Sequence, residues 1–180
     1  MVERYSRVEM SSKWDLQAKY KAWLKVELAA VKAWNELGLI KKDDCEKILK
    51  NAKFDIGRID EIEKTTKHDV IAFLTSVSEN LGAESRFLHY GMTSSDCIDT
   101  AVALQVRDSL DLIITDTQNL LKALEKRAFE FKDTLMVGRS HGIHGEPITF
   151  GLVLAVWFDE IKHALSLLEN AKECISYGKL

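Results

Sequence analysis

The longest stretch free of helix-breaking residues is the feature that most constrains this sequence. Residues 94–132 contain neither proline nor glycine, and apolar side chains recur along them at helical spacing. These 39 residues correspond to roughly 58 Å of unbroken α-helix at 1.5 Å per residue. A second helical pattern covers residues 148–176. Helices this long without internal caps are typical of a coiled coil or a large bundle rather than of a small globule.

Shorter helices are predicted before residue 94. They cover residues 12–37, 43–51, 57–66 and 69–81. Ser12, with Asp15 three residues later, resembles a capping box at the start of the first helix, and Gly38 suits its C-terminal end. Nine glycines and one proline in 180 residues leave too few turn residues for an all-β protein.

The sequence therefore predicts an all-α fold with two parts. A small N-terminal helical domain, residues 1–93, is followed by the first long helices of a large helical bundle, residues 94–180. The glycine-rich stretch 134–147 between the long helices is expected to be a loop. Because two helices cannot enclose their own apolar faces, we expect partner chains or further bundle helices to cover them, and we favour an N-terminal fragment of a longer protein.

Charge and cysteine usage narrow the function classes. The formal net charge is −3, with 25 basic and 28 acidic residues, so no basic excess indicates a nucleic-acid or anionic membrane partner. Three widely spaced cysteines, without a C-x-x-C pair, argue against a disulfide framework or a zinc site and fit a reducing cytoplasm. The charged N-terminus has no secretory signal pattern, and no stretch approaches 18 uninterrupted apolar residues. We expect a soluble, cytoplasmic protein.

Histidine is concentrated in three polar segments between the predicted helices. Residues 64–69, 89–96 and 138–147 hold four of the five histidines. Imidazole exchanges protons near neutral pH, and segments carried on rigid scaffolds often bear function. This distribution favours catalysis over a purely architectural role.

The last of these segments, GRSHGIHGEP, contains His141 and His144. Their spacing could place two metal ligands on one helix face, but its glycines disfavour a helix and no acidic or cysteine cluster supplies further ligands, so we expect no metal site. A flexible connector with incidental histidines is the simpler interpretation. The functional interpretation, which we prefer, is a close approach of the glycine backbone to a ligand.

The other segments also admit two interpretations each. Thr93 with Asp96 at the start of the long helix suits simple capping, while Thr93 and Ser94 beside a helix N-terminus would also bind a carboxylate or phosphate. Lys67 and His68 form either a solvated helix junction or a cationic corner for an anionic substrate. The terminal pair Arg4–Tyr5 would by default be a frayed tail.

Four blocks in register are far more specific than any one of them. RYSRxEM near the N-terminus, KTTKHDVIAF, HYGMTSSDCIDTA and GRSHGIHGEPITFG together resemble the adenylosuccinate lyase family of the fumarase/aspartase superfamily, and the resemblance covers essentially the whole chain. It implies reversible β-elimination of fumarate from adenylosuccinate, giving AMP, and from the purine intermediate SAICAR, giving AICAR. It implies no metal or organic cofactor, and a homotetramer whose active sites draw residues from three subunits.

The resemblance also implies individual roles. His141 matches the general acid, and His89 is expected near the substrate phosphate. The segments matched to substrate binding contribute Arg4, Tyr5, Lys67, His68, Asp69, Thr93 and Ser94. The family's signature loop with its catalytic serine base is absent from these 180 residues, so we expect the chain to be inactive alone.

Two alternatives remain open. Another superfamily lyase, such as argininosuccinate lyase, fumarase or carboxymuconate cycloisomerase, would share the bundle, although KTTKHD and RYSRxEM weigh against it. A non-enzymatic helical assembly module would share the long helices but would have no need for histidine-rich segments.

Overall fold

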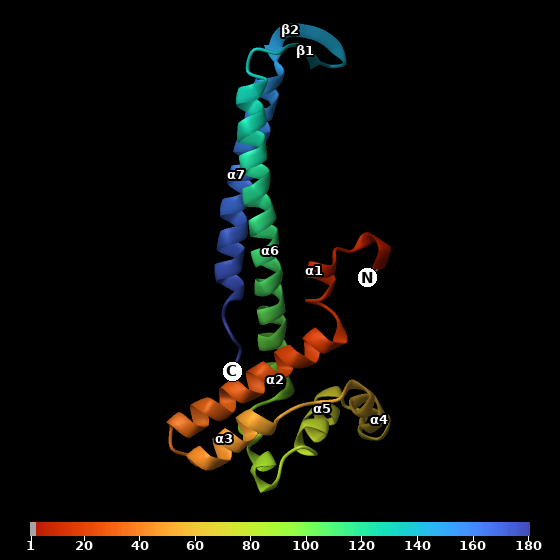
Figure 1. Ribbon diagram of the computed structural model, residues 1–180, viewed down its shortest axis with the longest axis vertical. Coiled ribbons are helices and arrows are strands. Elements are labelled where there is room, and N and C mark those ends of the chain that lie inside the picture. The colour runs from red at the N-terminus through yellow and green to blue at the C-terminus, as the bar shows by residue number, and fades with distance from the viewer. Residues whose placement is uncertain (1–2) are drawn as a thin grey trace. The chain divides into compact units, whose positions relative to one another are not determined.

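The computed structural model describes residues 3–180, and helices dominate it (Figure 1). Its longest elements are α6, Ser94–Glu130, and α7, Phe150–Ile175. The predicted all-α class is confirmed, because the only sheet within residues 3–180 is a two-stranded hairpin. In that part of the chain, no helix is long and apolar enough to cross a membrane.

The chain divides into two compact units. Among the described residues, the first comprises 3–108 together with 176–180, and the second comprises 109–175. Helix α6 contributes to both units because it begins at Ser94 and ends at Glu130. The sequence-based boundary at residues 93 and 94 coincides with the start of α6 and remains a prediction about domains.

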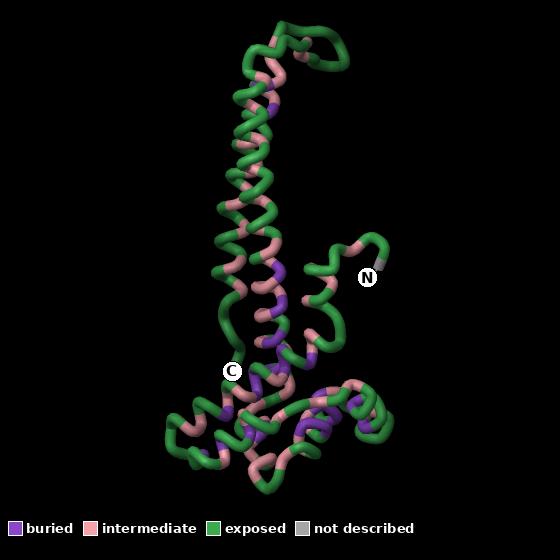
Figure 2. The backbone as a smooth tube through the Cα atoms, viewed as in Figure 1, coloured by how far each residue is buried: buried purple, intermediate pink, exposed green. Residues whose placement is uncertain are grey.

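The first unit is built from short helices around an aromatic core. They are η1 (Glu3–Tyr5), α1 (Val8–Ser11), α2 (Leu16–Glu36), α3 (Lys42–Asn51), α4 (Ile56–Thr66), α5 (Asp69–Ser78) and η2 (Ala83–Phe87). Tyr20 stacks on Phe73 with ring centroids 5.7 Å apart, and Trp23 meets Phe73 edge-on at 5.5 Å. Trp23 and Phe73 are almost completely buried, and Figure 2 shows the buried backbone positions of α2 and α5 in purple. Burying rings of this size contributes much of such a unit's stability.

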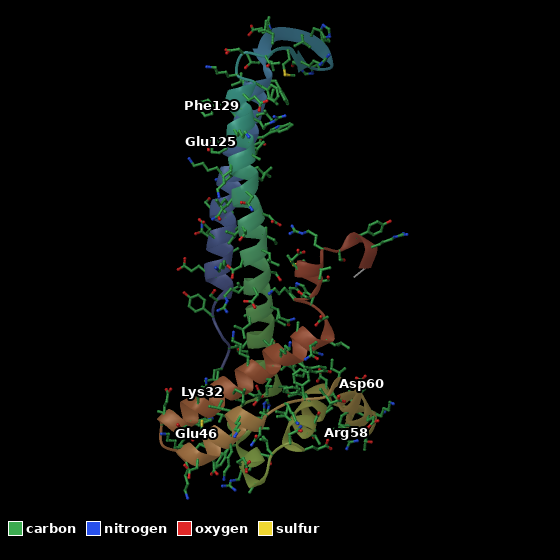
Figure 3. The ribbon with its side chains drawn as sticks, in the orientation of Figure 1. Lys32, Glu46, Arg58, Asp60, Glu125 and Phe129 are labelled. Carbon is green, nitrogen blue, oxygen red and sulfur yellow. The ribbon has the colours of Figure 1, made fainter. Side chains whose placement is uncertain are left out.

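Helices α4 and α5 form a pair whose connection carries three predicted site residues. Arg58, labelled in Figure 3, donates from α4 to the carboxylate of Glu79 at 2.7 Å and to Glu61 at 3.0 Å. Asp55 caps α4 by accepting the Arg58 N–H at 2.7 Å. These contacts join the start of α4 to the end of α5, and the two helices lead into and out of the turn at residues 67 and 68.

The start of α2 differs from the sequence prediction. Asp15, not Ser12, caps the helix, since its carboxylate accepts the Ala18 N–H at 2.6 Å. Ser12 instead ends α1, where its backbone N–H bonds to Val8 O at 2.9 Å. The capping-box prediction was wrong because a separate turn, Val8–Ser11, already uses Ser12, and a carboxylate three residues before Ala18 is the better acceptor.

The second unit contains a β-hairpin where a loop was expected. Strands β1, Leu135–Ser140, and β2, Ile143–Thr149, pair antiparallel, with an irregularity between Val137 and Arg139. His141 and Gly142 make the turn with φ values of 54° and 75°. Two successive residues at positive φ match the twist of a two-residue hairpin turn. The loop prediction was wrong because the stretch forms two paired strands: Gly142 lies in the tight reversal, while Gly138 and Gly145 lie in the strands.

Helix α7 returns beside α6 within the second unit (Figure 1). Lys172 forms an ion pair with Asp111. At the hairpin end, Gly151 lies against the backbone of residues 128 and 132, where a Cβ atom would stand 2.6 Å from Lys132 Cα. Only glycine permits the backbone at residue 151 to approach the end of α6 this closely.

Candidate active site

The connection between α4 and α5 places Lys67, His68 and Asp69 next to one another at the surface. Lys67 ends α4 in the left-handed conformation, with φ 54°, and its N–H bonds to Glu63 O at 2.9 Å. His68 caps α5, since its Nδ1 accepts the Ile71 N–H at 3.4 Å. A neutral His68 ring that accepts at Nδ1 carries its proton on Nε2. The geometry leaves the Lys67 ammonium and this imidazole edge exposed to a ligand.

Asp69 begins α5, and its half-exposed side chain bonds to the start of that helix. Its carboxylate accepts the Val70 N–H at 2.8 Å and lies 3.6 Å from His68 Nδ1. It therefore stabilises the helix N-terminus, where negative charge is favoured by the helix dipole.

The N-terminus of α6 holds Thr93 and Ser94. Asp96 accepts the Thr93 N–H at 2.7 Å and the Thr93 hydroxyl at 2.9 Å. The predicted capping by Asp96 is thus observed, and the Thr93 hydroxyl is directed into the cap. Within residues 3–180, the Ser94 hydroxyl has no hydrogen-bond partner. Ser94 is therefore better placed than Thr93 to donate to a bound anion.

Asp96 is also held by a lysine from the end of the chain. Lys179 Nζ lies 2.5 Å from Asp96 Oδ1 and 2.8 Å from Ser95 Oγ. This lysine, followed by the two hydrogen bonds from Thr93, lowers the pKa of Asp96 to about 2. Asp96 is consequently an ionised structural group and not a candidate proton donor.

The turn just before α6 contains a pair that the sequence analysis missed. Glu27, completely buried on α2, accepts the His89 backbone N–H at 2.8 Å and lies 2.7 Å from His89 Nδ1. The partners are 62 residues apart. One signal was available: Glu27 falls midway between Trp23 and Val31 on the apolar face of its helix, where a charged residue needs a partner.

Arg4 and Tyr5 lie in η1, and both side chains are exposed. The Arg4 guanidinium stacks over the Tyr5 ring, 4.7 Å from its centroid. The pair therefore presents one cationic and aromatic surface rather than two separate groups.

His141 belongs to the second unit, at the tip of the β-hairpin, and is exposed. His144 lies on β2 opposite Arg139. The two predicted alternatives for the acid therefore differ in setting: His141 is at an exposed reversal, and His144 is in a paired strand.

Backbone strain marks three of the histidine-segment residues. Among residues 3–180, the non-glycine residues with positive φ are Lys67, His89 and His141, at 54°, 58° and 54°. This conformation costs a side-chain-bearing residue about 1 kcal/mol or more, and such strain gathers at functional sites. Each of the three polar segments contributes one such residue.

Each segment is held by contacts of its own: Arg4 lies on the Tyr5 ring, His68 caps α5, and Thr93 is bound by Asp96. The structure thus orders each segment separately.

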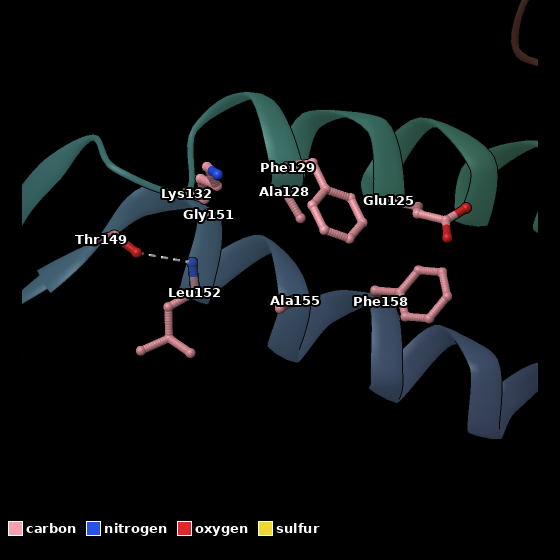
Figure 4. Close-up of a pocket in the computed structure, with 9 residues that line it drawn as sticks. All are labelled: Glu125, Ala128, Phe129, Lys132, Thr149, Gly151, Leu152, Ala155 and Phe158. Carbon is pink, nitrogen blue, oxygen red and sulfur yellow. Dashed lines mark hydrogen bonds between the residues drawn. The ribbon is translucent and has the colours of Figure 1, made fainter.

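A cavity of about 530 Å³ lies elsewhere, between α6 and α7 near the hairpin, and is mainly apolar (Figure 4). Its lining includes Phe129, Leu152 and Phe158 but none of the predicted site residues. Residues 3–180 also contain no group of three or more histidine, cysteine, aspartate or glutamate side chains arranged to hold a metal ion.

Comparisons with known proteins give a consistent result. The profile of a family described as lyase matches residues 4–180. Adenylosuccinate lyase of Helicobacter pylori strain 26695 is 59% identical over all 180 residues, and that of Bacillus subtilis strain 168 is 47% identical. The chain spans 41% and 42% of their lengths.

A solved structure is also similar. A fumarate lyase from Mesorhizobium sp. BNC1 superposes with a TM-score of 0.84 at 29% identity, covering 89% of this chain and 39% of the other.

Proposed function

This chain belongs to the lyase family, and on that premise we propose that it supplies part of an adenylosuccinate lyase, which releases fumarate from adenylosuccinate and from SAICAR. The identity of 59% and 47% to two adenylosuccinate lyases over the whole chain carries this proposal. The proposed enzyme works in the cytoplasm as a homotetramer with active sites shared between subunits.

The reaction demands groups of the kinds that the polar segments hold. A proton leaves the carbon next to a substrate carboxylate, and the resulting aci-carboxylate needs fixed donors and positive charge. Ser94 and Thr93 at the α6 N-terminus suit the carboxylates. Lys67 and Arg4 suit a carboxylate or the phosphate.

The C–N bond then breaks, and the leaving nitrogen needs a proton. We assign this role to His141, whose imidazole stands exposed at the hairpin tip. His68, Asp69 and Tyr5, whose ring stacks with Arg4, complete the proposed substrate-binding groups. The family resemblance attributes the carbon base to a serine outside these 180 residues.

The test is fumarate release by the full-length enzyme that carries this chain. Adenylosuccinate, SAICAR and argininosuccinate are offered separately, and fumarate is followed by ultraviolet absorbance. We expect turnover of the first two only. Turnover of argininosuccinate alone would replace this proposal with another superfamily activity, and turnover of none would refute it.

A further inference from the structure

Glu27 is a buried carboxylate with an unusually specific partner. Its side chain is 1% exposed, and burying a carboxylate costs several kcal/mol unless it is well paired. Within residues 3–180, His89 is the ion-pair partner found for Glu27. In the described chain no arginine or lysine forms an ion pair with Glu27. The buried Cys97 thiol also interacts with the carboxylate, since burial first and then Glu27 raise the pKa of that thiol. His89 is therefore the partner of Glu27 that can carry a positive charge.

The two oxygens of Glu27 hold two different parts of His89. Oε2 accepts the backbone N–H at 2.8 Å, and Oε1 lies 2.7 Å from ring Nδ1. The first bond stabilises a backbone with φ 58°, which a residue with a side chain adopts only at a cost. The second places a proton on Nδ1, because an ionised carboxylate can only accept.

The opposite ring nitrogen is left for another partner. The His89 side chain is 19% exposed, and in the described chain its Nε2 makes no hydrogen bond. Carboxylates that bind one nitrogen of a functional histidine commonly fix the tautomer and direction of the other.

The turn that carries His89 is anchored a second time from the same helix. Trp34 Nε1 donates to Tyr90 O at 2.9 Å, and the Trp34 ring packs against Gly91. Glu27 and Trp34 are seven residues apart, or about two turns along one face of α2. The chain then passes directly into Thr93 and Ser94, so α2 sets where the His89 ring stands relative to the start of α6 in the first unit.

We propose that Glu27 is a positioning residue that holds His89 with its Nε2 edge directed at an anionic group of the substrate. The inference rests on the proposed lyase function for the identity of that substrate. Glu27 itself does not touch the substrate, since it is buried beneath the turn.

A double-mutant cycle in the full-length enzyme tests this proposal. Glu27→Gln keeps the size but can no longer accept both His89 hydrogens. We expect kcat/KM for adenylosuccinate to fall about ten- to a hundred-fold, mostly through KM, as for the loss of a charged hydrogen bond. His89→Gln should show a similar loss, and the double variant should lose no more than about two-fold beyond His89→Gln. Losses that multiply would mean that Glu27 does not act through His89.

Asn35→Ala is the matched control. It removes another bond from α2 to a following loop, Asn35 Nδ2 to Ile40 O at 2.8 Å, without involving the His89 turn. Circular dichroism and oligomer size are compared for all variants. A loss in the control as large as in Glu27→Gln would reduce the effect to general loosening of α2 and overturn the proposal.

A measurement on the unmutated protein covers the case in which Glu27→Gln fails to fold. Nitrogen-15 NMR of labelled histidine should find the neutral His89 ring protonated at Nδ1, and a ring protonated only at Nε2 would contradict the proposal. If wild-type enzyme releases no fumarate, the proposed function fails while this measurement still decides the Glu27–His89 arrangement. If wild-type enzyme is active and the losses multiply, only the Glu27 inference fails.

Discussion

Two histidines three residues apart lie on one hairpin, and only one is expected to transfer the proton. His141→Gln in the full-length enzyme keeps a polar group but cannot protonate the leaving nitrogen. We expect kcat to fall by roughly 10² to 10⁴, with a much smaller change in KM, because the interaction belongs mainly to the transition state.

His144→Gln serves as the comparison and should lower kcat less than His141→Gln does. His68→Gln should mainly weaken substrate binding. The three variants are measured side by side at neutral pH, with assembly checked. A correctly assembled His141→Gln enzyme with near wild-type kcat, beside an impaired His144→Gln enzyme, would reverse the assignment.

Asp96 should make the free energy of unfolding of the first unit fall more steeply as the pH is lowered. Lys179 and Thr93 hold its folded pKa at about 2, below the ordinary 3.8. A group with a depressed folded pKa contributes stability that is complete above its unfolded pKa and is lost as pH falls toward the folded value. The contribution of Asp96 should therefore disappear between about pH 4 and pH 2.

Urea unfolding of the chain from pH 6 to pH 2 measures this effect. Asp96→Asn should be less stable than the parent at pH 6 and should approach it at pH 2. Asp99→Asn, at an exposed position of the same helix, is the control and should follow the parent throughout. Parallel curves for parent and Asp96→Asn would show that the Asp96 ion pair does not contribute.

At the scale of single residues, local spacing predicted a helix cap beside the candidate site. The Thr93–Asp96 cap follows from a three-residue interval and was confirmed. The Glu27–His89 contact joins residues on separate elements, and only packing of the turn on α2 brings them together. The sequence shows that Glu27 lies on the apolar face of its helix and needs a partner, but nothing in it identifies His89 as that partner.

Among the elements, the long helices were predicted closely. Residues 94–132 became Ser94–Glu130, and 148–176 became Phe150–Ile175. Helical periodicity and the absence of breakers are local properties, which explains this agreement. The hairpin was missed because its strands are mostly exposed, rich in glycine and histidine, and show no alternation of apolar residues. Its formation depends on a two-residue reversal at His141 and Gly142, which the sequence analysis did not recognise.

The close approach at the end of α6 makes Gly151 a sensitive position. A Cβ atom at residue 151 would contact the Ala128 carbonyl oxygen and stand 2.6 Å from Lys132 Cα, so backbone would have to move. We expect Gly151→Ala to lower the free energy of unfolding by about 1–3 kcal/mol, as overpacking commonly does.

Gly57→Ala provides the matched comparison. A Cβ atom there would meet only Asp55 Oδ1 at 3.4 Å, and alanine favours the helical backbone of α4, so stability should be unchanged or rise by up to about 1 kcal/mol. Chemical denaturation measures the free energy of unfolding of both variants and of the parent. Equal effects of the two substitutions would contradict the close packing at Gly151.

For the molecule as a whole, the second unit leaves large apolar side chains exposed. They include Leu120, Phe129, Leu152, Trp157 and Leu167. We expect the 180-residue chain expressed alone to self-associate. Sedimentation showing a stable, folded monomer at concentrations of about tens of micromolar, where such surfaces usually associate, would count against a bundle that requires further helices.

The same isolated chain should release no fumarate from adenylosuccinate, because the serine base attributed to the family is not among its residues. Purified chain, free of host enzyme, is assayed beside the full-length enzyme. Measurable turnover by the isolated chain would show that the essential groups lie within residues 1–180.

The left-handed residues Lys67, His89 and His141 carry a consequence for laboratory evolution. A library selected only for heat resistance should drift toward glycine or asparagine at Lys67 and His141, since both are exposed and relief of backbone strain is worth about 1 kcal/mol. His89 should be retained, because its replacement would leave the buried Glu27 carboxylate without its ring partner. The selected variants would be more stable but would lack Lys67 and His141, two side chains that the proposed enzyme uses to bind its substrate and to transfer a proton.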